Sequence, residues 1–198
     1  MKYAVFFAGP RKAGNTARMT QAFLEESREL GAEVEYVSLY EKDLRPCLGC
    51  MVCQDRLDCV GCVQKDDLEE IFRVVRESDV LVLASPIYAW YCTAPMKNFM
   101  DRVIYAGNKN YGKVRGDAFL RGKHVAAIAT CGYPVERGVD VWEEGLKRWS
   151  KHGKMHFHGI VGGRDFGSRA PEQMDIEKEA RAREFARQLY AEVTESQE

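Results

Sequence analysis

Tyr3-Ala-Val-Phe-Phe-Ala8 runs directly into Gly9-Pro-Arg-Lys-Ala-Gly14-Asn-Thr16. The first part is almost wholly apolar, which is typical of a strand buried on both faces of a parallel sheet. The second part is a glycine-containing loop, and residues 17–30 after it repeat apolar side chains at helical spacing up to Gly31. A strand, a glycine loop and a helix in this order predict the first unit of an α/β fold.

The alternation of strands and helices continues along the chain. Further strands are predicted at 33–39, 79–84, 123–130 and 155–161, and further helices at 68–78, 94–105, 139–151 and 171–193. Five strands alternating with five helices predict a doubly wound five-stranded parallel sheet with helices on both faces. We see no repeat and no linker, so we expect a single domain over 1–198, with a cysteine-rich insertion at 46–63 and a polar loop at 106–122.

The composition argues against several classes of protein. The 198 residues include 29 basic and 30 acidic side chains, and 45% are hydrophobic, which favours neither a disordered chain nor a nucleic-acid partner. No apolar run approaches the ~20 residues that cross a bilayer, and the first strand leads into the glycine loop rather than a cleavage site. We therefore expect a cytoplasmic protein with no membrane partner, whose thiols stay reduced and available for metal or redox chemistry.

The glycine loop is suited to a phosphate group. Backbone amides and the helix dipole after Gly9-x4-Gly14-Asn15-Thr16 can hold an anion. The ATP-type loop has lysine where this chain has Asn15, so a single terminal phosphate, as on FMN, fits better than a triphosphate. The alternative is a turn that only joins strand to helix.

Two later loops are suited to a planar ring. Ser85-Pro-Ile-Tyr-Ala-Trp-Tyr91 presents three aromatic rings where the third strand ends, and such rings can stack on a heterocycle or instead cover the core or a subunit interface. Thr130-Cys131-Gly132-Tyr133 follows the fourth strand, and its amides can donate hydrogen bonds to the edge of a flavin. Carboxyl ends of parallel strands share one edge of the sheet, so we expect these loops to meet.

These segments resemble the NAD(P)H-dependent FMN reductases and flavodoxin-like proteins. The resemblance rests on AGPRKAGNT, KDDLEEI and SPIY…APMKNFMDR, and extends to about residue 135; with the cysteines added, the chain resembles an iron-sulfur flavoprotein. It implies a flavodoxin-like fold, FMN as cofactor and NAD(P)H as a possible co-substrate. The implied FMN-binding residues are Pro10, Arg11, Lys12, Gly14, Asn15 and Thr16 at the phosphate, Pro86, Ile87, Tyr88 and Trp90 at the ring, and Thr130, Cys131, Gly132 and Tyr133 at its far edge. The family often has serine where this chain has Gly9, so amides must hold more of the phosphate.

Five of the seven cysteines lie between residues 47 and 62. Cys47-x2-Cys50-x2-Cys53 has the spacing by which thiolates converge on a [4Fe-4S] cluster, and Cys59 follows after five residues. The compact motif of iron-sulfur flavoproteins implies Cys59 as the fourth ligand. A count back from Lys65-Asp-Asp67 gives Cys62 instead, so we favour Cys59 and keep Cys62 as the alternative.

Other chemistry remains open for these cysteines. Zinc could be held through Cys50-x2-Cys53 and Cys59-x2-Cys62, although such pairs normally lie further apart. Reduced thiols, or a dithiol switch without metal, are a further interpretation. We expect Cys92 to be packed in the interior and Cys131 to approach the flavin through its backbone.

Two polar groups lie outside these motifs. His156 and His158 share one face of a strand, but no third ligand is evident, so we expect a structural role. A basic stretch comprises Lys109, Lys113, Arg115, Arg121 and Lys123. It is predicted to be a solvated loop that could receive a nicotinamide dinucleotide phosphate or an acidic electron-transfer partner.

The sequence thus predicts an oxidoreductase in which FMN takes electrons from NAD(P)H or a ferredoxin and a [4Fe-4S] cluster exchanges them singly. No catalytic side chain is needed, because the flavin carries the chemistry. The acceptor is a small-molecule oxidant or a small electron-transfer protein, and the resemblance implies a homodimer or homotetramer. The alternatives are a cluster-free NAD(P)H-dependent FMN or quinone reductase, a non-catalytic flavodoxin-type electron carrier, and a redox sensor.

Overall fold

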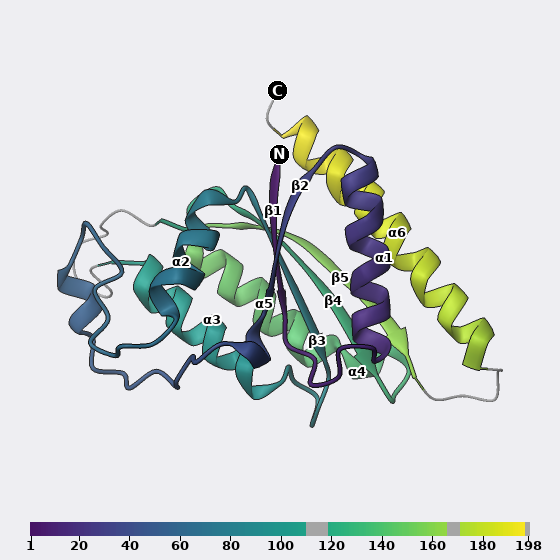
Figure 1. The fold of residues 1–198 in the computed structure, drawn as a ribbon, viewed down its shortest axis with the longest axis horizontal. Helices are drawn as coiled ribbons and strands as arrows, with labels where there is room; N and C mark the ends of the chain where they lie inside the picture. Colours follow the sequence, from purple (N-terminus) through teal and green to yellow (C-terminus); the bar gives the residue numbers. More distant parts are fainter. Residues whose placement is uncertain (110–118, 166–170, 197–198) are drawn as a thin grey trace.

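A computed structural model describes residues 1–109, 119–165 and 171–196 of the chain. Its strands form one sheet between two layers of helices (Figure 1). They are β1 (Lys2–Phe7), β2 (Glu33–Ser38), β3 (Val80–Pro86), β4 (His124–Cys131) and β5 (His156–Arg164). The order is β2-β1-β3-β4-β5, and every neighbouring pair is parallel. The predicted doubly wound, flavodoxin-like sheet is confirmed.

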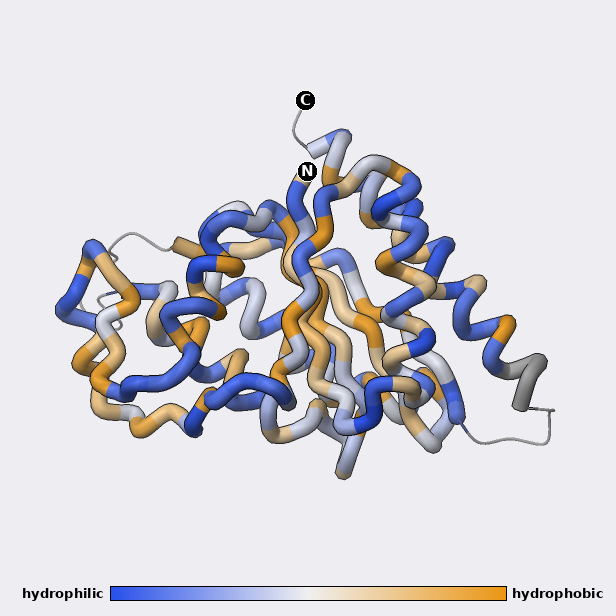
Figure 2. Tube along the Cα trace, viewed as in Figure 1, coloured by the Kyte–Doolittle hydropathy of each residue, from blue (hydrophilic) through white to orange (hydrophobic). Residues whose placement is uncertain are grey.

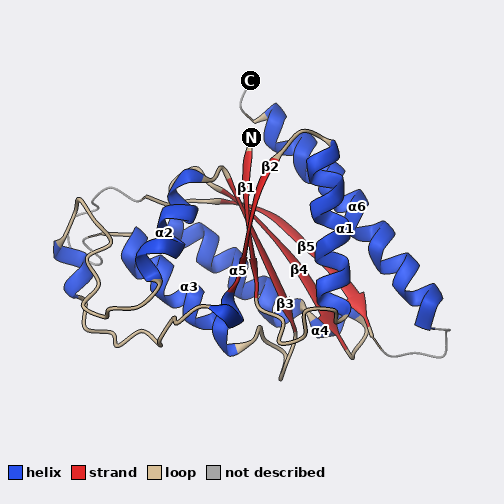
Figure 3. Cartoon of the chain, viewed as in Figure 1, coloured by secondary structure: helices blue, strands red, loops and turns tan. Residues whose placement is uncertain are grey.

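Helices cover both faces of the sheet (Figure 3). They are α1 (Asn15–Glu29), α2 (Leu68–Glu77), α3 (Ala94–Gly107), α4 (Val135–Gly138), α5 (Asp140–Gly153) and α6 (Pro171–Glu195), with short 3₁₀ turns η1 (Leu39–Glu41) and η2 (Val52–Asp55). The five predicted helices are present with small shifts of their ends. The sequence analysis did not foresee α4 or the two 3₁₀ turns, because segments of three or four residues carry too little periodicity.

Alternation along the central strands divides the core in two. On β1, Tyr3, Val5 and Phe7 pack in the cluster formed with α1 and α6. Ala4 and Phe6, which point the other way, pack in the cluster formed with α2, α3 and α5. In Figure 2 the central strands are coloured mostly hydrophobic, whereas hydrophilic and hydrophobic residues alternate along the helices. A strand covered on both faces must be apolar throughout, which is why β1 and β3 read as continuous apolar runs.

The strand order creates a switch point between β1 and β3. From β1 the chain moves to β2 at one edge, and then crosses over to β3 on the other side of β1. Loops that leave β1 and β3 in opposite directions open a crevice at the carboxyl edge of the sheet, where ligands bind in such folds. The glycine loop and the aromatic loop both lie at this edge. Within the described part of the chain, no helix is long and apolar enough to span a membrane.

Candidate functional site

The glycine loop is held to the end of β4 by a buried pair of hydroxyl groups. Thr16 lies in the first turn of α1, and its Oγ1 is 2.6 Å from Oγ1 of Thr130 at the end of β4. Thr16 is 5% exposed and Thr130 2%, so their bond is shielded from water. Two segments that are 114 residues apart in the chain therefore share one hydrogen bond.

A second buried group joins the loops after β1 and β3. Thr93 Oγ1 donates to the carbonyl of Ala8 at 2.8 Å, and the Thr93 amide donates to Ser85 Oγ at 3.0 Å. The Ile87 amide donates to the Thr130 carbonyl at 2.8 Å. The loops after β1, β3 and β4 are thereby fixed relative to one another, as the sequence predicted from their positions.

The start of α1 is open to an anion. Gly14 is its N-cap, no side chain caps the helix, and the first turn carries no acidic residue. Pro10, Arg11 and Lys12 are exposed beside it, and Lys12 forms an ion pair with Glu41. Uncapped amides and a local excess of positive charge suit a phosphate.

Gly9 has a steric explanation. A Cβ atom at this position would lie 2.3 Å from Cζ of the buried Phe7 ring. Serine, which the family often has here, would displace that ring. Any side chain at position 9 would therefore require the Phe7 ring to move.

The aromatic loop is a tight hairpin with strained backbone. Tyr88 and Tyr91 exchange backbone hydrogen bonds of 2.9 and 3.1 Å, while Ala89 and Trp90 between them have φ of 49° and 61°. Left-handed backbone is unfavourable for residues other than glycine, so the turn stores strain. Tyr88 and Trp90 are half exposed, and the Trp90 ring lies 5.4 Å from the ring of Tyr133, centroid to centroid. The loop predicted to contact the flavin ring and the loop predicted to contact its far edge thus meet through these two side chains.

The remaining predicted FMN-binding residues lie close by. Pro86 is buried at the end of β3 and Ile87 is partly buried, whereas Gly132 is exposed. Cys131 is buried, and its Sγ donates to the Tyr133 carbonyl at 3.3 Å. Burial raises the pKa of the Cys131 thiol, which favours the uncharged form.

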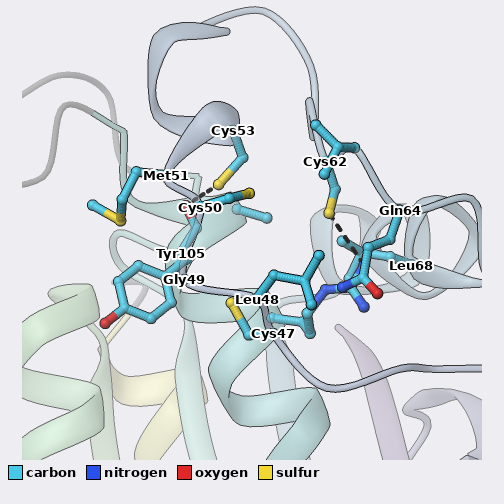
Figure 4. A pocket seen from close by; sticks show the side chains of 13 residues that line it. Cys47, Leu48, Gly49, Cys50, Met51, Cys53, Cys62, Gln64, Leu68 and Tyr105 are labelled. Carbon is cyan, nitrogen blue, oxygen red and sulfur yellow. Dashed lines mark hydrogen bonds between the residues drawn. The ribbon is translucent and has the colours of Figure 1, made fainter.

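Four cysteines line one pocket beside α2 and α3 (Figure 4). They are Cys47, Cys50, Cys53 and Cys62, and the pocket is completed mainly by apolar side chains such as Leu48, Val63 and Leu68. Cys59 lines a separate, charged hollow with Asp58, Glu69, Arg73 and Arg76. All seven cysteines are free thiols. The sequence spacing therefore favours Cys59 as the fourth cysteine of the set. In the structure, however, it is Cys62 that lines the same pocket as Cys47, Cys50 and Cys53.

The thiol groups of the described residues are not close enough together to form a complete metal site. Over the described residues, no group of three or more histidine, cysteine or acidic side chains is arranged to hold a metal ion. The donor chemistry nevertheless suits iron or zinc, because these are reduced thiols in a pocket that largely excludes polar groups.

The sequence analysis missed Arg102, which lies beneath this pocket. Arg102 is 2% exposed in α3 and forms a bidentate ion pair with Asp66, with Nη–Oδ distances of 2.8 and 3.1 Å. Nη1 donates to the Arg45 carbonyl at 2.6 Å, and Nη2 lies 3.3 Å from Cys62 Sγ. Burial opposes ionisation of Asp66, but hydrogen bonds from Arg102 and from backbone amides outweigh it and lower the pKa of this carboxyl. An arginine on the apolar face of α3, three residues after Phe99, was the available signal.

The prediction for Lys109 was wrong. This lysine is only 4% exposed rather than part of a solvated loop, and it donates to the carbonyls of Cys53, Cys59 and Val60. Burial lowers the pKa of Lys109. Lys123 is also partly buried and donates to the carbonyls of Arg76 and Ser78, whereas Arg121 is exposed. Lys113 and Arg115, with the rest of 110–118, lie outside the described residues.

The histidines form a cluster at the opposite edge of the sheet. His124 Nδ1 lies 2.8 Å from His158 Nε2, and His158 Nδ1 lies 2.6 Å from Glu192 Oε2. The His156 ring stacks on that of His124 at 5.1 Å, so His124 is the third imidazole, which the sequence analysis had not connected with the His156 and His158 pair. Among the described side chains, this cluster too lacks the arrangement of a metal site.

A glycine loop and an aromatic loop at the switch point of a parallel sheet are the arrangement expected of a mononucleotide-binding α/β protein. Residues 1–157 match the NADPH-dependent FMN reductase family, and the chain belongs to that family. It is accordingly an FMN-containing oxidoreductase.

Similar proteins agree with this assignment. An iron-sulfur flavoprotein of Archaeoglobus fulgidus is 36% identical over 77% of this chain and 77% of its own length. An iron-sulfur flavoprotein of Methanosarcina thermophila is 29% identical over 81% of this chain and 76% of its own. An FMN-dependent NADH-azoreductase from Bacillus anthracis, solved with FMN, shares the fold with a TM-score of 0.69 at 15% identity, covering 96% of this chain and 99% of that one.

Proposed function

We propose that this protein couples two-electron flavin chemistry, with NAD(P)H or a ferredoxin as donor, to one-electron transfer through a [4Fe-4S] cluster. The observation that carries the proposal is the pocket lined by Cys47, Cys50, Cys53 and Cys62, with Cys59 in a separate hollow. Thiolates in such number and spacing suit a cubane cluster, and relatives named iron-sulfur flavoproteins support the assignment.

The flavin half of the proposal rests on the loops at the carboxyl edge. The amides at the start of α1 would bind the phosphate, while Trp90 and Tyr133 would border the isoalloxazine ring and limit its access to water. FMN supplies hydride acceptance and single-electron transfer when bound. The chain's own contribution is to orient the ring and to tune it through backbone amides, so no side chain is required as acid or base.

Cys47, Cys50 and Cys53 are the proposed common ligands of the cluster. Cys59 is the fourth ligand by spacing, and Cys62 is the alternative because it already lines the pocket. The two candidates are held differently, since Cys62 Sγ is a hydrogen-bond partner of Arg102 whereas the Cys59 carbonyl is bound by Lys109.

Anaerobic purification followed by iron, sulfide, zinc and FMN analysis tests the proposal. We expect about four iron and four sulfide per chain together with one FMN. Cys59→Ser should lose the cluster while Cys62→Ser retains it if spacing governs, and the reverse result would assign Cys62. Cys92→Ala, which removes a thiol outside the 46–63 segment, is the control and should keep full cluster content. Zinc in place of iron, or no metal after reconstitution, would overturn the cluster.

A cluster-free NAD(P)H-dependent FMN or quinone reductase is the second candidate. It is favoured by the lack, in the described residues, of a ready-made group of metal donors. An NAD(P)H:quinone oxidoreductase from Methanothermobacter marburgensis has the same fold, with a TM-score of 0.68 at 20% identity. Steady oxidation of NADPH or NADH with a quinone by iron-free protein would favour this candidate. If neither NADH nor NADPH bleaches the flavin, the result would favour a flavodoxin-type carrier or a ferredoxin donor.

We also propose that the protein assembles as a homodimer or homotetramer. The carboxyl edge exposes about half of the surface of each of three aromatic side chains, Tyr88, Trp90 and Tyr133. Such a large aromatic area exposed to solvent is typical of an interface. Light scattering during size-exclusion chromatography measures the assembled mass, and a monomer at micromolar concentration would contradict the proposal.

A further inference from the structure

Two cations lie beneath the cysteine-rich segment, and they differ in their partners. Arg102 in α3 is neutralised by Asp66, with which it forms a bidentate ion pair. Lys109, two residues beyond the end of α3, forms no ion pair with any carboxylate of the described residues. A buried cation without a close ion-pair partner is costly, so the burial of Lys109 needs a physical explanation.

Within the described residues, the hydrogen bonds of the Lys109 ammonium all go to backbone carbonyls of the cysteine segment. Its Nζ lies 2.9 Å from the Cys53 carbonyl, 2.7 Å from that of Cys59 and 3.1 Å from that of Val60. The three carbonyl acceptors match the three hydrogen-bond donors of an ammonium group. The ring of Phe119 lies 5.9 Å from Nζ, within range of a cation–π contact.

These contacts join the two ends of a loop. Cys53 lies in η2, and Cys59 and Val60 follow the loop that leaves this 3₁₀ turn. Apart from η2, the segment has no regular backbone pairing to hold it, so the lysine replaces the hydrogen bonds that a sheet or helix would supply. A single ammonium thus sets the distance between the carbonyls of Cys53 and Cys59.

We infer that Lys109 is a positioning residue for the iron-sulfur site: its ammonium holds the backbone of Cys53 and Cys59 in the metal-free protein and supplies the counter-charge of the anionic cluster. The second half of this inference rests on the proposed function. It explains why a lysine that forms no close ion pair within the described residues is buried against a segment that carries five thiols.

The charge has a defined consequence for redox chemistry. A thiolate-bound cluster is anionic, and reduction adds one negative charge. A fixed cation close to its ligands stabilises the reduced form more than the oxidised form, which raises the reduction potential. Removal of the cation should therefore make the potential more negative.

The positioning role is tested on the metal-free protein by hydrogen exchange of residues 53–60. We expect at least about tenfold faster exchange in Lys109→Met than in the wild type, because three carbonyls lose their donor. Lys147→Met is the matched control: it removes an exposed lysine that pairs with Glu143 on α5, and should leave this exchange unchanged. Unchanged exchange in Lys109→Met would overturn the positioning role. If Lys109→Met does not fold, Lys109→Gln, which keeps a donor but no charge, takes its place.

The charge role is tested by a potentiometric titration of the reconstituted cluster followed by electron paramagnetic resonance. We expect Lys109→Met to shift the reduction equilibrium by about tenfold toward the oxidised form, which is about 59 mV for one electron. Lys109→Arg keeps the charge and should stay near the wild-type potential, as should Lys147→Met. A wild-type potential in fully loaded Lys109→Met would overturn the charge role. Wild-type protein that takes up no iron would overturn both the proposed function and the charge role, whereas the exchange experiment needs no cluster and still decides the positioning role.

Discussion

The loops at the carboxyl edge and the cysteine-rich segment are both irregular backbone, but they are held by different forces. At the carboxyl edge, neutral hydroxyls do the holding: Thr16 with Thr130, and Ser85 with Thr93. Beneath the cysteines, two buried cations take that place, with Arg102 bound to Asp66 and Lys109 bound to three carbonyls.

The difference follows from what each region connects. The loops after β1, β3 and β4 are short and begin at strands whose positions the sheet already determines, so single neutral hydrogen bonds suffice. The connection between η1 and α2 is long and contains only one 3₁₀ turn. Charge-assisted hydrogen bonds are roughly twice as strong as neutral ones, and they suit a segment that has few other contacts. We therefore expect substitutions in the two regions to differ in how much stability they remove and in which cofactor they affect.

The largest effect should come from Arg102→Met. The substitution removes the bidentate partner of the fully buried Asp66 carboxylate and leaves only Arg45 as an ion-pair partner among the described residues, with an Nε–Oδ2 distance of 3.8 Å. Loss of one partner costs about 3–5 kcal/mol in comparable buried pairs. Denaturant unfolding of the metal-free protein measures the loss. Arg148→Met, which breaks the exposed pair with Glu144, should cost no more than about 0.5 kcal/mol. An equal loss in the two variants would show that the buried pair is not an anchor; adding Asp66→Asn to Arg102→Met should recover part of the stability.

Thr130→Val should have the next largest effect on stability, and it should affect FMN binding rather than the cluster. It keeps the shape of the side chain but leaves the Thr16 hydroxyl without its buried partner, a loss of about 1–3 kcal/mol. We expect weaker FMN binding, measured by flavin fluorescence, with cluster content unchanged. Thr194→Val on the exposed side of α6 is the control and should alter neither. Loss of iron together with FMN would mean that the two regions are not independent.

Ala89→Gly should produce a smaller effect of opposite sign. Glycine tolerates the φ of 49° that strains alanine at this position, so the free energy of unfolding should rise by up to about 1 kcal/mol. Thermal unfolding of the flavin-free protein measures the gain. A decrease in stability would show that the hairpin turn between Tyr88 and Tyr91 is not strained.

The smallest effect should come from the histidine cluster, which is remote from both regions. Burial, with the neighbouring His158 and His156, lowers the pKa of His124, so the native state binds fewer protons than the unfolded chain. Asp79 acts in the opposite direction but does not reverse the shift. The contribution of His124 is therefore full above about pH 6.5 and is lost as pH falls toward its native pKa. His124→Gln should flatten the dependence of unfolding free energy on pH in this range; identical pH profiles would contradict the assignment.

Much of the fold followed from local patterns in the sequence. The apolar runs of β1 and β3 and the helical spacing after the glycine loop are repeated features of neighbouring residues, so burial on both faces and the parallel sheet could be inferred from them. The same reasoning predicted that the loops before Thr16 and after Ser85 and Thr130 would share one edge. The position of Trp90 against Tyr133 could not be inferred in this way, because it depends on a strained turn between residues 88 and 91.

The sequence by itself determined the fold class, the family and the presence of a thiol-rich segment, because strand and helix periodicity, loop motifs and cysteine spacing are all local. Only the tertiary structure decided that Cys62 shares a pocket with Cys47, Cys50 and Cys53, and that Arg102 and Lys109 are buried rather than solvated. Arg102 lies 36 residues from Asp66, and Lys109 lies 50 residues from Cys59. Charges are buried only where a distant segment supplies their partners, and no local pattern reports which segment that will be.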